Sequence, residues 1–197
     1  MASETAVTSR IQQRFSQHVL GTHRYRGQET IVIRREGLLD VVRFLKDDAD
    51  LAFDVLMDLT AVDYLTFGRS LRSAPTLATP SPLPYYMTSK ASTERWERLV
   101  DPDAYRFEVV YHFYSSRLNY RLRVKVPLTE ADPTVDSLTG LWRAANWFER
   151  EVWDLFGVTF IGHPNLKRIL MYEQFVGHPL RKDYPVNTRQ PLIGPLN

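Results

Sequence analysis

The sequence predicts an α+β fold: a mixed sheet of about four main strands including an antiparallel hairpin, helices packed on one face, and an extended irregular C-terminal tail. Three observations support this fold class. Two stretches of alternating apolar residues are joined by a short connection, which is typical of a hairpin. Other stretches place apolar residues three or four positions apart, as amphipathic helices do. Residues 165–197 have little periodicity and contain four prolines, which disfavours long regular structure.

The composition is ordinary for a globular protein, with 44% hydrophobic and 24% charged residues, and 197 residues suit one domain with an inserted segment. The chain has no cysteine, which excludes disulfides and thiolate-held iron–sulfur clusters and favours a cytosolic compartment. The net charge of +2 is too small to argue for a nucleic-acid partner. The first ten residues lack the apolar core of a secretory signal, and no apolar run is long enough to predict a membrane span.

The N-terminal part of the domain, residues 1–65, is expected to contain two helices and two strands. The first helix is predicted from Ile11, Phe15 and Val19, which recur every four residues, and is expected to end at Gly21. A β-branched stretch, Thr30–Arg35, predicts the first strand. The second helix is predicted from the stripe Leu38, Val41, Val42 and Leu45. The second strand is predicted from Phe53, Val55, Met57 and Leu59, which alternate with Asp54 and Asp58.

Between residues 66 and 103 the regular pattern disappears. This segment is rich in Pro, Ser and Thr, and we interpret it as a loop-rich insertion. Loops of this length are uncommon in compact domains unless they have a functional or docking role.

Residues 104–160 complete the domain with a hairpin and a long helix. The hairpin Arg106–Val126 is predicted to be antiparallel with one solvent-exposed face, and His112 is expected to be a surface residue on that face. Its apolar face is expected to comprise Phe107, Val109, Tyr111, Phe113, Tyr120, Leu122, Val124 and Val126, with Arg121, Arg123 and Lys125 on the other face.

The helix after the hairpin is predicted from about Thr139 to Phe156, with Ser137 or Thr139 as its cap. Gly157 is expected to end it in the left-handed conformation, and one brief strand should follow. Its apolar stripe consists of Leu138, Leu141, Ala145, Phe148, Val152 and Leu155.

Several kinds of catalytic motif are missing from the sequence. The nine glycines never form a dinucleotide-binding G-x-G-x-x-G or a phosphate-binding loop that ends in Gly-Lys-Ser/Thr. A G-x-S-x-G elbow and a cysteine nucleophile are also absent. The sequence therefore supports neither a phosphate-binding loop nor a nucleophile for covalent catalysis.

Gly-His-Pro occurs twice, around His163 and His178. Glu173 and Asp183 could complete a metal site with them on paper, and a general-base role also remains open. Each histidine, however, follows a glycine, which permits an unusual turn, and precedes a proline, which restricts the backbone. We therefore favour two shaped loops over a metal site or a catalytic base.

The long helix carries Glu149, Arg150, Glu151 and Asp154 within six residues, and three roles are open. Two carboxylates can perform acid–base chemistry, Arg150 and Asp154 can pair at i,i+4, and the neighbouring tryptophans suggest a protein interface. Pairing or an interface is favoured, because no nucleophile or cofactor motif accompanies the carboxylates. The tail segment "PLRKDYP" should either wrap its own domain or lie on another subunit.

The stretch "EREVWDLFGVTFIGHPNLKRIL" resembles the signature of the 30-kDa-type subunit of respiratory complex I, the NADH–quinone oxidoreductase. The downstream "GHPLRKDYP" is similar to the second landmark of that family, whereas "DLTAVDYL" matches more weakly. The resemblance implies that the following residues form the family signature and a partner interface: Glu149, Arg150, Glu151, Asp154, Gly157, His163, Pro164, Lys167, Arg168, Gly177, His178, Pro179, Arg181, Lys182, Asp183 and Tyr184.

The resemblance implies a non-catalytic scaffold subunit in the peripheral arm of a proton-pumping complex. Its partners would be the 49-kDa-type subunit near the quinone site and other peripheral-arm subunits, including iron–sulfur subunits. FMN, the iron–sulfur clusters and quinone would belong to the complex, with no catalytic, metal or cofactor residue in this chain. The complex would lie at the cytoplasmic side of the inner membrane, and residues 161–197 would form a partner-binding tail.

Two alternatives remain beside this interpretation. Related energy-converting hydrogenases and deazaflavin- or ferredoxin-linked complexes contain similar subunits, and a metal-dependent hydrolase using His163 and His178 belongs to a different class. The insertion is expected to pack on a neighbouring subunit through its apolar residues, such as Leu83, Tyr85, Tyr86 and Trp96.

Overall fold

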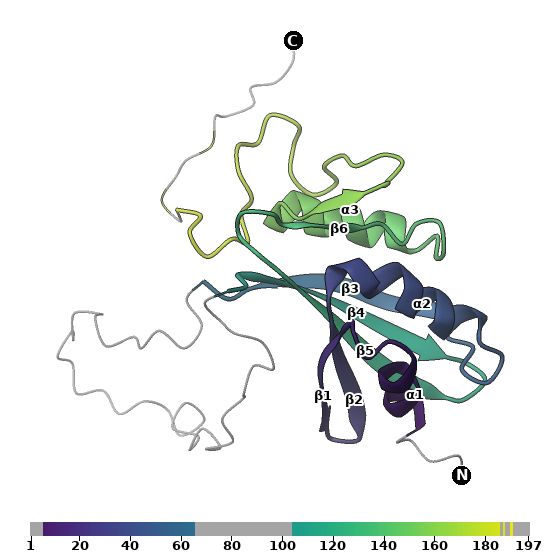
Figure 1. The fold of residues 1–197 in the computed structure, drawn as a ribbon. Helices are drawn as coiled ribbons and strands as arrows, with labels where there is room; N and C mark the ends of the chain where they lie inside the picture. Colours follow the sequence, from purple (N-terminus) through teal and green to yellow (C-terminus); the bar gives the residue numbers. More distant parts are fainter. Residues whose placement is uncertain (1–5, 66–103, 186, 188–189, 191–197) are drawn as a thin grey trace, which may run out of the picture.

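The computed structural model describes residues 6–65, 104–185, 187 and 190, so the predicted insertion and the end of the tail lie outside the described residues (Figure 1). The helices are α1 (Ala6–Arg14), the 3₁₀ helix η1 (Arg35–Gly37), α2 (Leu38–Asp47) and α3 (Ala145–Phe156). The strands are β1 (Val19–Tyr25), β2 (Gln28–Ile33), β3 (Val55–Asp63), β4 (Phe107–Ser115), β5 (Tyr120–Leu128), β6 (Thr134–Asp136) and β7 (Thr159–Ile161). Within these ranges no helix has the length and apolar character needed to cross a membrane.

The main sheet has five strands in the order β1-β2-β5-β4-β3. Strands β2 and β5 are parallel, whereas the other neighbouring pairs are antiparallel, so the predicted mixed sheet is confirmed. The predicted hairpin is also confirmed, since β4 and β5 pair from Phe107 opposite Leu128 to Ser115 opposite Tyr120. A second, parallel pair is formed by β6 and β7. The fold class is therefore α+β, as the sequence predicted.

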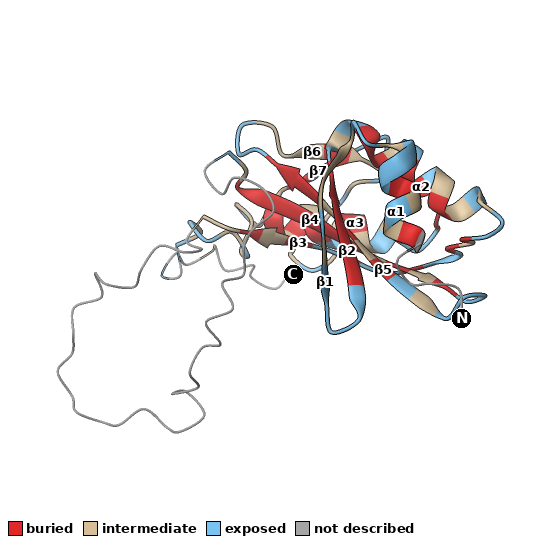
Figure 2. Ribbon diagram, turned by 60° about the horizontal axis from the view of Figure 1, so that its bottom comes forward, coloured by how far each residue is buried: buried red, intermediate tan, exposed pale blue. Residues whose placement is uncertain are grey.

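The hydrophobic core lies on one face of this sheet (Figure 2). The apolar face of β4 is fully buried, because Phe107, Val109, Tyr111 and Phe113 all have 0% exposure. All three α-helices contribute to the same core cluster, and the stripe of α2 that the sequence predicted is buried in it. The helices therefore cover one face, as predicted, and none of the described helices lies on the other face of the sheet.

The prediction of a helix through residues 15–21 was wrong. Helix α1 ends at Arg14, and Val19 and Gly21 belong to β1, an edge strand that pairs with β2. Much of β1 is polar and exposed, so its alternation is weak, and its pairing with β2 rather than its own pattern determines its conformation.

The buried face of β3 also differs from the prediction. Val55 and Met57 are 40% and 44% exposed, whereas Leu56 and Leu59 are buried. The pairing with β4 shifts between Leu56 and Asp58, as at a β-bulge. One extra residue exchanges the two faces of a strand, so a simple alternation cannot predict which residues face the core.

Helix α3 begins at Ala145, six residues later than predicted, and neither Ser137 nor Thr139 caps it. Residues 138–144 form turns instead, with hydrogen bonds from the amides of Leu141 and Trp142 to the carbonyl of Leu138. The short strand β6 before these turns was not predicted, whereas β7 and the left-handed Gly157 (φ 75°) are confirmed.

Candidate functional site

The second Gly-His-Pro segment caps the C-terminal end of α3. A helix leaves its last carbonyl groups without partners within the helix. Here the Asp154 carbonyl accepts a hydrogen bond from His178 Nδ1 (3.0 Å), and the Leu155 carbonyl accepts one from the Leu180 amide (3.0 Å). The Phe156 carbonyl accepts one from Arg181 Nε at 2.6 Å. The tail thus binds to its own domain, which was one of the two predicted possibilities.

This cap requires a glycine at position 157. Its φ of 75° lies in the left-handed region, where residues with a Cβ are strained. A Cβ atom there would also lie 2.6 Å from both Arg181 Nη2 and the His178 ring. Gly157 therefore allows the cap to approach the end of the helix.

Asp154 holds the loop that follows the first Gly-His-Pro. Its side chain is fully buried, and Oδ2 accepts hydrogen bonds from the consecutive amides of Ile169 (3.0 Å), Leu170 (2.9 Å) and Met171 (2.9 Å). Burial alone would raise the pKa of Asp154, but these hydrogen bonds and Arg168 lower it below its ordinary value. Asp154 is therefore an ionised anchor for the loop.

Arg168 joins Asp154 to the far end of the same loop. Nη1 donates to Asp154 Oδ1 at 2.5 Å, and Nη2 donates to the carbonyls of Phe175 (2.9 Å) and Gly177 (3.0 Å). The predicted pair between Arg150 and Asp154 is therefore wrong. Arg150 donates instead to the carbonyls of Lys167 (3.1 Å) and Arg168 (3.3 Å), because Arg168 already occupies the carboxylate.

The two histidines make local structural hydrogen bonds. The Asn165 amide donates to Nδ1 of His163 (3.0 Å), so Nε2 carries the proton and donates to the Asn146 carbonyl (3.2 Å). Burial lowers the pKa of His178, and the nearby Arg181 and Arg168 add to this effect. Among the described residues, no group of three or more His, Asp or Glu side chains is arranged to hold a metal ion.

Glu149 is a fully buried carboxyl group on α3. It accepts hydrogen bonds from the Leu138 amide (2.6 Å) and from Ser137 Oγ (2.6 Å), and so attaches the turns after β6 to the helix. Burial raises its pKa to about 7, against the lowering effect of these two hydrogen bonds. These contacts explain why Ser137 does not cap α3.

A cluster that was not predicted from the sequence connects the tail to the sheet. Arg106, with 5% of its side chain exposed, binds both carboxylate oxygens of Asp63 (3.1 and 2.9 Å) and also binds Asp183 (2.7 Å) and Glu130 (2.5 Å). The Lys182 amide donates to Asp63 as well (2.9 Å). Burial would raise the pKa of Asp63, but Arg106 and the Lys182 amide lower it. Asp63 lies in "DLTAVDYL", so the weaker family resemblance there was the available signal.

The signature residues therefore divide into an inward and an outward set. The inward set consists of residues whose charged or ring side chains form hydrogen bonds within this chain: Glu149, Arg150, Asp154, His163, Arg168, His178, Arg181 and Asp183. Tyr184 joins them by stacking on Phe175 with ring centroids 6.0 Å apart. The outward, exposed set is Glu151, Pro164, Lys167 and Lys182. Gly162 and Gly177 both have positive φ, so the loops are shaped as predicted.

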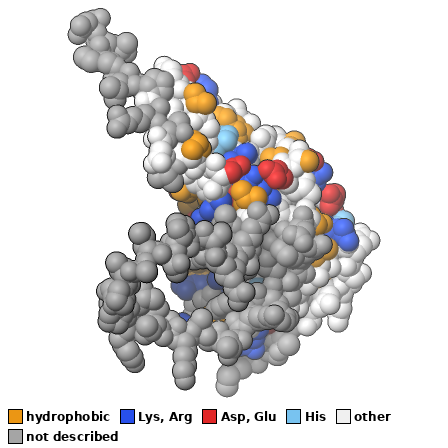
Figure 3. Space-filling model, turned by 90° about the vertical axis from the view of Figure 1, so that its left-hand side faces the viewer, with side chains coloured by type: hydrophobic (Ala, Val, Ile, Leu, Met, Phe, Trp, Pro, Cys, Tyr) orange, Lys and Arg blue, Asp and Glu red, His pale blue; other side chains and the backbone are white. Residues whose placement is uncertain are grey.

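Exposed apolar side chains accompany the outward set. Trp147, Ile161, Leu170, Val176 and Leu180 are 64%, 56%, 54%, 71% and 46% exposed, respectively. They belong to α3, β7 and the loops over α3 on the side away from the sheet (Figure 1). The part of the surface in Figure 3 that is not grey shows apolar side chains among charged ones. We refer to these five residues as the apolar surface of the tail.

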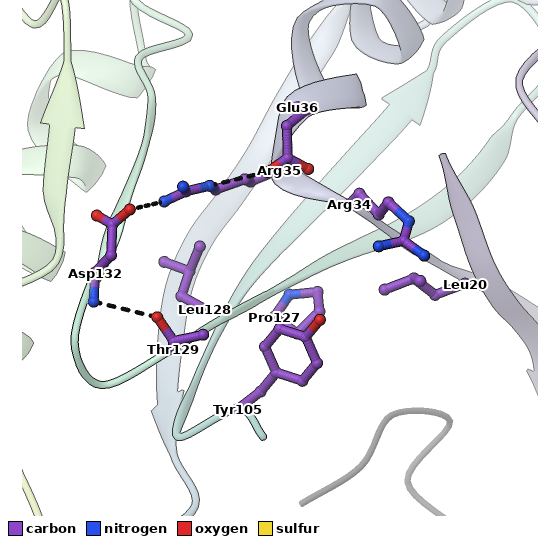
Figure 4. A pocket seen from close by; sticks show the side chains of 9 residues that line it. All are labelled: Leu20, Arg34, Arg35, Glu36, Tyr105, Pro127, Leu128, Thr129 and Asp132. Atoms are coloured by element: carbon purple, nitrogen blue, oxygen red, sulfur yellow. Dashed lines mark hydrogen bonds and ion pairs between the residues drawn. The ribbon is translucent and has the colours of Figure 1, made fainter. Parts of the chain in front are cut away.

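A small hollow of about 170 Å³ lies between η1 and the end of β5 (Figure 4). Arg35 lies at its edge and pairs with Asp132 (2.5 Å) and Glu36 (3.1 Å), so this cation is already neutralised. Arg34 and Tyr105 line the same hollow. Its geometry offers no paired acid and base for catalysis.

Comparison with known proteins supports the signature. Residues 31–190 match the model of the family described as respiratory-chain NADH dehydrogenase, 30 Kd subunit. The corresponding NADH-quinone oxidoreductase subunit of Citrifermentans bemidjiense is 40% identical over 199 residues, which cover 100% of both chains. A solved trypsin-resistant fragment of Nqo5 is 28% identical with a TM-score of 0.55, over 81% of this chain and 99% of the fragment. A chain of an archaeal membrane-bound sulfane sulfur reductase shares the fold, at 19% identity and a TM-score of 0.59, over 93% of this chain and 86% of that one.

Proposed function

This chain belongs to the 30 Kd subunit family of the respiratory-chain NADH dehydrogenase, and we propose that within that complex it is a non-catalytic docking subunit. As a subunit of an NADH–quinone oxidoreductase, it belongs to the electron-transport chain. The apolar surface of the tail is the observation that carries the docking role.

The docking role follows from how this surface is built. Buried ion pairs and helix-cap hydrogen bonds hold the loops of residues 162–185 against α3. Loops held in this way nevertheless leave Leu170 and Val176 54% and 71% exposed, and Trp147 on α3 is 64% exposed. Clustered exposed apolar side chains with a polar rim are typical of protein interfaces, where tryptophan is often a main contributor to binding.

The histidines and buried carboxylates of the signature support structure rather than chemistry. His163, His178 and Asp154 are engaged in hydrogen bonds that fix the backbone. A general base must reach a substrate proton, whereas Asp154 is fully buried among its amide donors. FMN, the iron–sulfur clusters and quinone would therefore be held by other subunits of the complex.

The proposed partner is the 49-kDa-type subunit near the quinone site, with further contacts to iron–sulfur subunits of the peripheral arm. In this arrangement the chain would support electron transfer from NADH to quinone by holding its neighbours in place. It would lie peripherally, at the cytoplasmic side of the inner membrane, in a proton-translocating complex.

Affinity purification of the tagged chain from native membranes tests the docking role. Leu170→Asp and Val176→Asp should each reduce the co-purified subunits about tenfold, because they place a charge in an apolar contact. Leu118→Asp is the matched control, since Leu118 is 37% exposed on the turn between β4 and β5. Normal assembly with lost turnover would contradict the proposal, and stoichiometric zinc or iron in the isolated chain would favour a metal-dependent hydrolase.

A further inference from the structure

The face of the main sheet opposite the helices carries a row of polar residues that crosses all five strands. The strand register aligns His23 with Thr30, Thr30 with Arg123, Arg123 with His112, and His112 with Asp58. The residues next to His112 along β4, Tyr111 and Phe113, are buried in the core. Because side chains alternate along a strand, the row lies on the face opposite the described helices.

A recess of about 310 Å³ opens on this face. It is lined by Gln28, Glu29, Met57, Asp58, His112, Phe113, Arg121, Leu122 and Arg123. Four neighbouring strands thus contribute to one hollow, and Met57 at its edge is 44% exposed. The β-bulge of β3 between Leu56 and Asp58 brings Met57 to the surface next to Asp58.

The charges in the recess are only partly balanced. Arg121 and Arg123 form no hydrogen bond or ion pair within the part of the chain that the structure describes. By contrast, Lys125, two residues further along β5, pairs with Glu108 at 2.7 Å. Glu29 accepts a hydrogen bond from Thr8 of α1 (2.9 Å), so its carboxylate is directed to the helix side. Two guanidinium groups therefore face one carboxylate, that of Asp58.

The cationic environment affects the pKa values of the two histidines in the row. Burial lowers the pKa of His112, and Arg123 and Lys125 lower it further, although Asp58 acts in the opposite direction. Burial also lowers the pKa of His23, with Lys125 and Arg123 adding to it and Glu108 opposing it. His23 Nδ1 is buried and has no hydrogen-bond partner among the described residues. An anion placed on this face would oppose the lowering by Arg123 and Lys125.

We infer that this face binds an extended acidic segment of a partner protein, laid along β5 with carboxylates at alternate positions. Residues two apart in a strand are about 6.6–6.8 Å apart, so Arg121 and Arg123 repeat with the same spacing as side chains i and i+2 of an extended segment. Guanidinium groups bind carboxylates through paired hydrogen bonds. The residues of this chain between 66 and 103 include five basic and four acidic side chains, so their charge does not suit this role.

This face is separate from the apolar surface of the tail, and the inference does not rest on the proposed docking role. The first test measures binding of labelled six-residue peptides to the full chain at low ionic strength. One peptide alternates serine and glutamate, and the other has the same composition with its three glutamates adjacent. The alternating peptide should bind about tenfold more tightly.

Arginine variants then locate the binding. Arg121→Gln/Arg123→Gln should remove the tenfold preference. Arg34→Gln/Arg143→Gln removes the same charge from two exposed arginines elsewhere and should change affinity by less than about twofold. Thermal melting of both variants shows whether the fold is intact. Binding of the alternating peptide should also raise the pKa of His112, which an NMR titration measures.

Other outcomes would overturn the inference. Equal affinity for the two peptides, or an equal loss of affinity in the two double variants, would show that acidic peptides are attracted only by the net positive charge of the chain. A wild-type dimer in sedimentation that Arg121→Gln/Arg123→Gln abolishes would assign the face to a second copy of this chain. A large gain in peptide affinity on removal of residues 66–103 would assign it to this chain's own segment.

Discussion

Glu149 shows how a single buried group can make stability depend on pH. The carboxyl group is fully buried, and its two hydrogen bonds come from Ser137 and Leu138 rather than from a cation. Burial disfavours the charged form, so the folded chain holds this proton more tightly than the unfolded chain does. The pKa of Glu149 is about 7 in the folded chain, against an ordinary value of 4.5.

The free energy of unfolding should therefore decrease as the pH rises from about 4.5 to about 7, because the unfolded chain loses this proton first. The full effect amounts to roughly 3 kcal/mol at 1.36 kcal/mol per pKa unit. Glu149→Gln should remove this component of the slope in urea unfolding followed across that pH range. Glu151→Gln, an exposed change on the same helix, should behave as the wild type does. Parallel wild-type and Glu149→Gln curves would contradict the prediction.

At the scale of elements, α3 and the tail form one unit. The carbonyl groups of the last helical turn bind His178, Leu180 and Arg181, so the cap lies about 25 residues beyond the helix it caps. The cation of Arg181 also lies at the negative end of the helix dipole, where a positive charge is favourable. The arrangement stabilises both the helix and the tail.

Arg181→Ala should destabilise this unit by about 1.5–3 kcal/mol, the range for a hydrogen bond with a charged donor. Hydrogen exchange at the Leu180 amide should become faster, and the amount of assembled complex should fall with activity in proportion. Lys182→Ala removes a neighbouring, exposed cation and should leave exchange unchanged. A variant that assembles normally yet loses turnover would instead place Arg181 in the chemistry.

The sequence allowed the hairpin, α2 and Gly157 to be predicted, because each depends on a local pattern. The face of β3 could not be predicted, since a bulge is set by pairing with β4. The Arg106–Asp63 pair joins residues 43 positions apart, so no periodic pattern in the local sequence could indicate it. Asp154 was recognised as a signature residue, but the i,i+4 rule assigned it to Arg150 rather than to the more distant Arg168.

At the scale of the whole molecule, assembly and folding should respond differently to the loss of the insertion. Residues 66–103 join β3 to β4, which are neighbours in the sheet, so a short connection could replace them. Their deletion should weaken assembly more than it lowers the melting temperature of the isolated chain. The two measurements are co-purification from membranes and thermal unfolding. A truncated chain that assembles normally would contradict the expected docking role of this segment.

The contact between Lys182 and Asp63 also constrains the order in which the chain can mature during synthesis. The two residues are 119 positions apart, so the tail can dock only after the sheet and α3 have formed. Because a nascent chain leaves the ribosome from its N-terminus, the cap of α3 emerges after the helix that it caps. Closure of the Arg106 cluster therefore requires residues up to Asp183, and a product terminated before His178 would present an uncapped helix to cellular quality control.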